Sequence, residues 1–226
     1  MSVPNILATR YASAAMRSIW TPENKIRAER RLWLTVMEAQ ADLGVSFGGD
    51  DPEQVLADYQ AVLDDVDLDS IAEREAITRH DVKARIEEFN ALAGHEHIHK
   101  GMTSRDLTEN IEQMQVLESL RLVRDKMVAT LNQLSRLAAQ FSDQAIAGRS
   151  HNVAAQVTTL GKRFATAIDE MLVAWDHVNE LIERYPARGI KGPMGTAQDM
   201  LDLLGGDESK LDDLEHRVAD HLGFNQ

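Results

Sequence analysis

The feature that most constrains the fold is a run without Gly or Pro from Ser104 to Ala147. Apolar residues return along this run at helical spacing, at Leu107, Ile111, Met114, Leu117, Leu120, Met127, Leu131, Leu134, Ala138 and Phe141. We therefore expect one helix here, roughly 60 Å long at about 1.5 Å per residue. Because globular helices average about 11–12 residues, a helix of this length indicates a bundle that is shared between chains.

The rest of the sequence also favours helices. Thr21 and Pro22 form a typical helix start, because Thr caps free N–H groups and Pro suits the first helical position. We expect shorter helices over 22–43, 52–63, 69–77, 82–93 (capped by Asp81), 197–204 and 208–222, and a second long helix that follows Gly148–Asn152 and ends at Tyr185-Pro186. Residues 1–20 are expected to form an irregular arm, and no clean strand pattern is visible. The sequence therefore predicts an all-α fold, with a small helical N-terminal domain (1–105) followed by the first long helices of a bundle (106–226).

Composition excludes several classes of protein. The net charge of −13 argues against a nucleic-acid-binding protein, which needs a basic surface. The sequence has no Cys, and therefore neither a disulfide framework nor a thiolate zinc site. No apolar run approaches the roughly 20 residues that span a membrane, and the first residues lack a secretory signal pattern. We expect a cytoplasmic protein with neither nucleic-acid nor membrane partners.

A histidine-rich segment leads into the longest predicted helix. It holds His95, His97 and His99, then turns at Gly101 and enters the helix through Thr103-Ser104-Arg105-Asp106. Hydroxyl and acidic residues suit a helix start, whose free N–H groups also bind anions. The sequence therefore indicates a site for a negatively charged small molecule. Alternate His residues on an extended segment also allow a zinc or copper site, but no carboxylate-rich cluster accompanies them in the sequence, and we expect no metal.

Four further polar segments lie outside the expected helices. Arg10-Tyr11 offers a guanidinium and a phenol for a nucleotide, although local sequence alone favours a solvated surface Arg and a packed Tyr on a polar arm. His80 lies at a helix entrance, where a capping or packing role is the plainer interpretation of the residue taken alone. Ser150-His151 does not by itself indicate a hydrolase, because triads are assembled from distant positions. Gly189–Thr196 has the composition of a phosphate-binding loop without the order of residues in a P-loop, and an ordinary interhelical turn explains it as well.

Five segments resemble a known family. The segment GRSHNVAAQVTTLGKRFA (148–165) resembles G-R-T-H-x-x-x-A-x-x-T-T-x-G of the fumarase/aspartase superfamily. The segments HKGMTSRD (99–106) and RHDV (79–82) are similar to its adenylosuccinate-cleaving branch, and TRYAS and GIKGPMGT (189–196) occur where that branch has a substrate-binding R-Y and a Gly-rich turn. The five segments follow the family order over nearly the whole chain. The resemblance implies a truncated version of the superfamily's helical bundle.

The resemblance also implies a reaction and its residues. The reaction is the β-elimination of fumarate from adenylosuccinate, giving AMP, and from the succinylated aminoimidazole-carboxamide ribotide of purine synthesis. It assigns the general acid to His151, with His80 and His99 as supporting catalytic groups. Substrate contacts are implied for Arg10, Tyr11, Asp81, Thr103, Ser104, Asp106, Ser150 and Thr158, the last expected on the helix after His151. No cofactor or metal is implied, and the family assembles as homotetramers whose sites combine several subunits.

The sequence departs from the family pattern in three places. Ser150 replaces the usual Thr, and Pro193 and Met194 stand in the Gly-rich turn where Met194 replaces a smaller residue. The superfamily's S-S-x-M-P-x-K-x-N-P loop, which carries the catalytic base, is absent from this sequence. We therefore interpret the chain as an N-terminal fragment that is inactive alone. The alternatives are another lyase of the superfamily, acting on argininosuccinate or on malate and fumarate, and a non-catalytic helical oligomerisation module.

Overall fold

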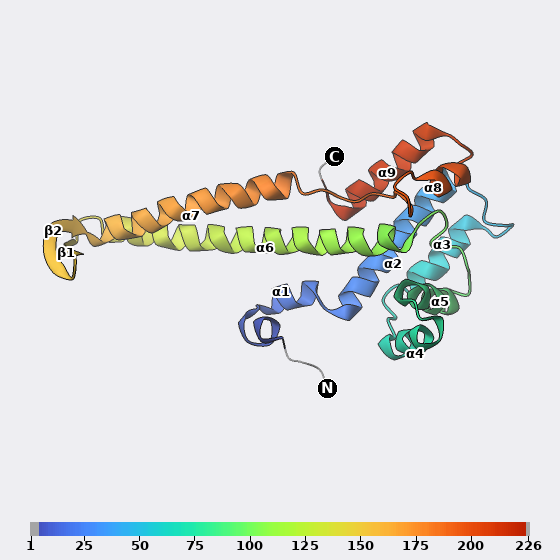
Figure 1. Cartoon of the computed structure of the whole chain (residues 1–226), viewed down its shortest axis with the longest axis horizontal. Coiled ribbons are helices and arrows are strands. Elements are labelled where there is room, and N and C mark those ends of the chain that lie inside the picture. The colour runs from blue at the N-terminus through green and yellow to red at the C-terminus, as the bar shows by residue number, and fades with distance from the viewer. Residues whose placement is uncertain (1–4, 225–226) are drawn as a thin grey trace. The chain divides into compact units, whose positions relative to one another are not determined.

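The computed structural model describes residues 5–224. Its elements in chain order are η1 (Leu7–Tyr11), α1 (Ala14–Ile19), α2 (Pro22–Asp42), α3 (Pro52–Ala61), α4 (Leu68–Thr78), α5 (Asp81–Ala93), α6 (Ser104–Gln140), β1 (Ala145–Ser150), β2 (Val153–Thr159), α7 (Leu160–Glu183), α8 (Gln198–Leu203) and α9 (Glu208–Leu222) (Figure 1). The mostly helical class predicted from the sequence is confirmed. None of the described helices combines the length and apolar composition that a membrane span requires.

The chain divides into two compact units. Unit 1 comprises the chain up to Val116 and again from Pro186, and unit 2 comprises Leu117–Tyr185. Helix α6 therefore contributes its first turns to unit 1 and the remainder to unit 2. The domain boundary that the sequence suggested, between residues 105 and 106, lies inside unit 1, and that division stays a prediction.

Unit 1 is built around α2. The Thr21 hydroxyl accepts a hydrogen bond from the N–H of Asn24 (3.3 Å), and Pro22 occupies the first helical position, so the predicted start of this helix is confirmed. Helix α2 packs against α3 and α9. The fully buried side chains of the unit include Leu32, Trp33, Met37, Tyr59, Phe89, Leu107, Ile111, Ile190, Met200 and Leu214. Residues from both ends of the chain therefore share one core.

A buried ion pair joins α2 to α5 inside that core. The Arg30 guanidinium lies 2.6 Å from the Glu88 carboxylate, and neither side chain is accessible to solvent to any meaningful extent. Arg30 also donates to the carbonyl oxygens of Val62, Leu63 and Asp65 after α3. Because a buried charge is costly unless it is paired and hydrogen-bonded, these contacts fix the chain between α3 and α4 against α2.

Unit 2 contains a β-hairpin that the sequence analysis missed. Helix α6 ends at Gln140, whereas the helix was expected to continue to Ala147. Strands β1 and β2 then pair antiparallel, with Ser150 opposite Val153. His151 and Asn152 form the two-residue loop between them, with φ of 50° and 64°. Positive φ at both positions is typical of a type I′ turn, and Asn is among the residues that tolerate it best.

The hairpin leads directly into α7, which runs back beside α6 in unit 2 (Figure 1). The Gly161 N–H donates to the carbonyl oxygen of Phe141 (2.8 Å), and the N–H of Leu160 donates to that of Gln144. A Cβ at Gly161 would lie 2.8 Å from the Phe141 carbonyl oxygen and closer still to that of Ala138. Glycine is therefore required here because the two helices approach each other backbone to backbone.

Candidate functional site

The predicted site residues are divided between the two units. His80, Asp81, His99, Thr103, Ser104 and Asp106 lie in unit 1, as do Arg10 and Tyr11, whereas Ser150, His151 and Thr158 lie in unit 2. Within unit 1, His80, His99 and Asp106 are close enough to influence one another electrostatically. The start of α6 is therefore the place where predicted site residues from separate segments meet.

His80 links the start of α5 to the start of α6. Its Nδ1 accepts a hydrogen bond from the N–H of Lys83 (3.3 Å), so the N-cap of α5 is His80 and the expected cap, Asp81, is wrong. Asp81 lies in the first helical turn, where a carboxylate is favourable, and is paired with Arg85 (2.9 Å). Because Nδ1 of His80 accepts, the neutral ring carries its hydrogen on Nε2, which lies 3.3 Å from the Ser104 hydroxyl oxygen. The imidazole thus orients the Ser104 hydroxyl.

His99 is held as a neutral imidazole. The indole N–H of Trp33 donates to its Nδ1 (3.0 Å), and the backbone at His99 is left-handed, with φ of 67°. Burial lowers the pKa of His99 to about 4; the Asp106 carboxylate opposes this shift and the His80 ring adds to it. At neutral pH the ring therefore has its hydrogen on Nε2 and acts as an uncharged hydrogen-bond donor.

Asp106 organises the loop between α7 and α8. Its carboxylate is fully buried and accepts hydrogen bonds from the N–H groups of Thr103 (2.9 Å), Lys191 (3.0 Å) and Gly192 (3.1 Å). The Arg188 guanidinium lies 3.2 Å from the same carboxylate. The contact with Thr103 is that of a capping box at the start of α6. Asp106 is thus occupied by internal partners, and its predicted contact with substrate stays a prediction.

The Gly189–Thr196 loop rests on the first turns of α6. Asn110 exchanges two hydrogen bonds with the backbone of Gly189, and Arg188 also reaches Glu109 (3.0 Å) and the carbonyl oxygen of Gly192. The loop N–H groups of Lys191 and Gly192 point at Asp106, which takes the place that a phosphate would have in a phosphate-binding loop. Arg188, Glu109 and Asn110 were not predicted as site residues, because their hydrogen bonds join positions about 80 residues apart in the sequence.

The carboxylate of Asp106 can be tested by substitution. We expect Asp106→Asn to lower the free energy of unfolding by about 2–3 kcal/mol, because an amide brings N–H groups against donors that now face a carboxylate. The matched control is Glu109→Gln, which also contacts Arg188 but is more exposed and should cost less than about 1 kcal/mol. Urea unfolding followed by circular dichroism measures both. Equal unfolding midpoints for the two variants would contradict the role of Asp106.

In unit 2, the predicted acid lies at the tip of the hairpin. His151 and Asn152 form the exposed two-residue loop, and Ser150 is the last residue of β1. Arg149 donates to the carbonyl oxygen of Asn152 (3.0 Å) across the turn. Thr158 lies in β2 opposite Ile146, so its expected place on the helix after His151 is wrong. The imidazole of His151 is therefore presented to solvent on a rigid turn.

Arg10 and Tyr11 lie in η1 and are both exposed, with the Arg10 guanidinium 5.6 Å from the centroid of the Tyr11 ring. The described part of residues 1–20 forms two short helical segments, η1 and α1, so the expected irregular arm is wrong there. The N-cap Ser13 explains α1, since its hydroxyl accepts from the N–H of Met16 (3.2 Å).

The histidines of the His95–His99 segment separate in the structure. His99 faces Trp33, whereas His95 and His97 lie near Asp50 and Asp58. One ligand atom from each of Asp50, His95 and His97 lies within 4.8 Å of those from the other two.

Comparison with known proteins gives the relatives of this chain. Residues 9–200 match a family model described as lyase. The chain is 33% identical to the adenylosuccinate lyase of Saccharomyces cerevisiae and 34% identical to that of Schizosaccharomyces pombe; each alignment covers 97% of this chain and 46% of the relative. The chain thus spans about half the length of these curated relatives.

Solved structures show the same fold. The 3-carboxy-cis,cis-muconate lactonizing enzyme from Pseudomonas putida matches with a TM-score of 0.80 at 18% identity, over 97% of this chain and 49% of that one. A fumarate lyase from Mesorhizobium sp. BNC1 matches with a TM-score of 0.76 at 22% identity, over 93% of this chain and 48% of that one.

Proposed function

This chain belongs to the lyase family whose model spans residues 9–200, and on that premise we propose that it forms part of an adenylosuccinate lyase. The proposed reaction breaks the C–N bond of adenylosuccinate to give AMP and fumarate, and performs the same elimination on the succinylated aminoimidazole-carboxamide ribotide. The observation that carries the proposal is the identity of 33–34% to two adenylosuccinate lyases over 97% of this chain. The His80, His99 and Ser104 arrangement supports it.

The start of α6 is proposed to bind an anionic part of the substrate. Thr103 and Ser104 present hydroxyls at the positive end of the helix, where phosphate and carboxylate groups are favoured. His99, neutral and with its hydrogen on Nε2, donates a hydrogen bond to an oxygen without adding a charge. His80 holds the Ser104 hydroxyl in place. These roles require no cofactor or metal.

His151 is proposed as the general acid that protonates the departing nitrogen. Imidazole suits this role because its ordinary pKa of about 6.5 lies near the operating pH. The exposed turn of β1 and β2 presents the ring, and Ser150 lies beside it as a contact for substrate. Arg10 and Tyr11 are proposed to contact the nucleotide, through the guanidinium and the phenol.

Assembly into a homotetramer is proposed to complete the site. Apolar side chains of unit 2 that are exposed in the single chain support this, and they are Val123, Val128, Val153, Val157, Leu172, Val173 and Leu181. Single exposed apolar residues are ordinary, but a set along two long helices and the hairpin indicates a surface that another chain covers.

We propose that the base that starts the elimination belongs to the family's S-S-x-M-P-x-K-x-N-P segment, which this sequence does not contain. We therefore expect the 226-residue chain alone to release no AMP from adenylosuccinate above the uncatalysed rate. The assay compares it with the protein from the complete reading frame that encodes it. Turnover by the chain alone at the rate of that protein would refute the assignment of the base to the missing segment.

A further inference from the structure

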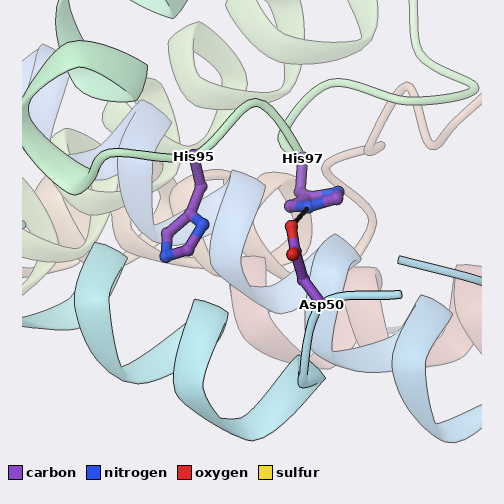
Figure 2. A group of neighbouring side chains, drawn as sticks. All are labelled: Asp50, His95 and His97. Atoms are coloured by element: carbon purple, nitrogen blue, oxygen red, sulfur yellow. Dashed lines mark hydrogen bonds and ion pairs between the residues drawn. The ribbon is translucent and has the colours of Figure 1, made fainter. Parts of the chain in front are cut away.

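Three side chains outside the proposed lyase site, two imidazoles and one carboxylate, lie close together. Asp50 lies in the turn before α3, and His95 and His97 lie in the segment between α5 and α6 (Figure 2). One ligand atom from each lies within 4.8 Å of those from the other two. Among the described residues 5–224, these three residues form a group whose ligand atoms are close enough to share one metal ion. The group combines two imidazoles with a carboxylate, the kind of set that binds zinc in proteins.

A second carboxylate orients His95. The Nε2 of His95 lies 2.8 Å from an Asp58 oxygen, so Nε2 carries the hydrogen and Nδ1 keeps its lone pair for a metal. Histidine ligands commonly donate their other N–H to a carboxylate in this way, which fixes the ring and makes it a better ligand. Asp58 is on α3 and so is held by a regular helix. The sequence did not reveal this group, because Asp50 and Asp58 precede the histidines by about 40 residues.

The backbone that carries the two histidines is fixed. The Tyr59 hydroxyl donates to the carbonyl oxygen of His95 (2.9 Å) and accepts from the N–H of His97 (3.2 Å). The His97 ring packs on Phe47, with ring centroids 5.0 Å apart. Tyr59 itself is fully buried. The imidazoles are therefore presented from a rigid support, whereas Asp50 is exposed and free to adjust.

The carboxylates are ionised at neutral pH. Hydrogen bonds from His97 and from His95 hold the pKa of Asp50 and of Asp58, respectively, below the ordinary value. The Oδ2 of Asp50 lies 2.8 Å from Nε2 of His97, so a cation entering between them replaces one hydrogen bond by two metal–ligand bonds. Two carboxylates and two imidazoles thus lie close together, and such a set of oxygen and nitrogen ligands favours a divalent cation.

Lys100 opposes the metal. Its ammonium lies 2.7 Å from Nδ1 of His97 and donates to it, which places the hydrogen of the neutral ring on Nε2. A metal at Nε2 requires the hydrogen on Nδ1, so Lys100 must turn away. The Phe47 ring, whose centroid is 5.7 Å from the ammonium, offers a cation–π surface close by. Removing Lys100 should therefore strengthen metal binding.

We propose that Asp50, His95 through Nδ1 and His97 through Nε2 bind one Zn²⁺ ion, with water as the fourth ligand. Tetrahedral zinc, at about 2.0–2.1 Å from its ligand atoms, spaces them roughly 3.3 Å apart, so binding draws the three side chains together. The ion joins the turn before α3 to the segment that leads into His99 and the start of α6. Its role is to stabilise unit 1, and it takes no part in the elimination.

The test is calorimetric titration of the tag-free, chelator-treated 226-residue chain with ZnCl2. We expect one Zn²⁺ per chain with micromolar or tighter affinity, and a higher thermal unfolding midpoint when zinc is present. Asp58→Asn should weaken binding by about 10–100-fold, and His97→Ala and Asp50→Ala by at least as much. Lys100→Met should tighten it. The control is His216→Ala, an exposed histidine on α9, which should leave the affinity unchanged.

The Asp50→Ala variant separates loss of the metal site from loss of folding, because Asp50 is exposed in a turn and its replacement does not disturb the core. Substitution of Co²⁺ for Zn²⁺ provides an independent readout, since a tetrahedral site gives intense visible absorption that the Asp50→Ala variant should lose. The absence of stoichiometric zinc binding, or binding that is the same in Asp50→Ala and His97→Ala as in the parent chain, overturns the proposal.

Discussion

Replacing His151 by Ala is expected to lower kcat for adenylosuccinate cleavage by about 10²-fold or more in the protein from the complete reading frame that encodes this chain. The reason is that the departing nitrogen would leave without a proton donor. Because the residue lies at an exposed hairpin tip, its removal leaves the core intact. Steady-state kinetics measure the effect, and KM should change less than kcat, since the lost interaction belongs to the transition state.

Two further variants separate chemistry from folding in this experiment. His151→Asn lacks a proton donor of suitable pKa, yet Asn tolerates the positive φ of 50° at this position, so the turn keeps its conformation. It should be as impaired as His151→Ala. His177→Ala, an exposed histidine on α7 in the same unit, should have the activity of the parent protein. A rate near that of the parent for His151→Asn would remove His151 from the acid role.

The second large effect concerns stability. Arg30→Ala is expected to lower the free energy of unfolding by about 3–5 kcal/mol, because it leaves Glu88 as a buried charge without a partner. The carbonyl oxygens of Val62, Leu63 and Asp65 lose their donor at the same time. Urea unfolding of the 226-residue chain, followed by far-ultraviolet circular dichroism, measures the change.

A matched control lies on the same helix. Arg27 pairs with Asp64 at 3.4 Å, but this pair is largely exposed, and Arg27→Ala should cost less than about 1 kcal/mol. Replacing both members of the buried pair, in Arg30→Met with Glu88→Leu, should cost less than Arg30→Ala alone, because no charge remains unpaired. If Arg30→Ala unfolds at the same urea concentration as Arg27→Ala, the buried pair does not contribute as its geometry indicates.

Some helix ends were predictable from the sequence because they depend on residues close together along the chain, whereas the cap of α5, the end of α6 and the start of α7 were predicted wrongly. Thr21 caps α2 as expected, and the second long helix ends within a few residues of Tyr185-Pro186. The hairpin of β1 and β2 was missed because Ser104–Ala147 contains no Gly or Pro to end the helical pattern. The available signal was local: Val153, Val157, Thr158 and Thr159 favour strands, and they follow a Ser-His-Asn turn.

Most of the side-chain arrangement at the start of α6 was not predictable from the sequence. From the sequence, Asp106 is a carboxylate in the first turn of a helix, and this position suggested an anion site. In the structure Asp106 is bound by Arg188, Lys191 and Gly192, which are more than 80 residues away along the chain. The contact of Trp33 with His99 crosses 66 positions. Periodicity and capping rules describe neighbours along the chain and contain no information about such pairs.

The prediction about a metal site was limited in the same way, because the sequence does not show which distant residues lie near the histidines. Alternation correctly placed His95 and His97 on one side of the segment, but it also included His99, which faces Trp33 instead. The missing carboxylates, Asp50 and Asp58, come from the turn before α3 and from α3 itself. From the sequence we expected no metal, and the zinc site proposed above depends on these two carboxylates.

The central claim is tested most directly by the rate of fumarate release from adenylosuccinate by the protein from the complete reading frame that encodes this chain. We expect turnover of adenylosuccinate at a kcat of about 1 s⁻¹ or more, within the usual range of enzymes. We also expect no turnover of argininosuccinate or malate under the same conditions. Turnover of either of these without turnover of adenylosuccinate, or no turnover of any of the three, would contradict the central claim.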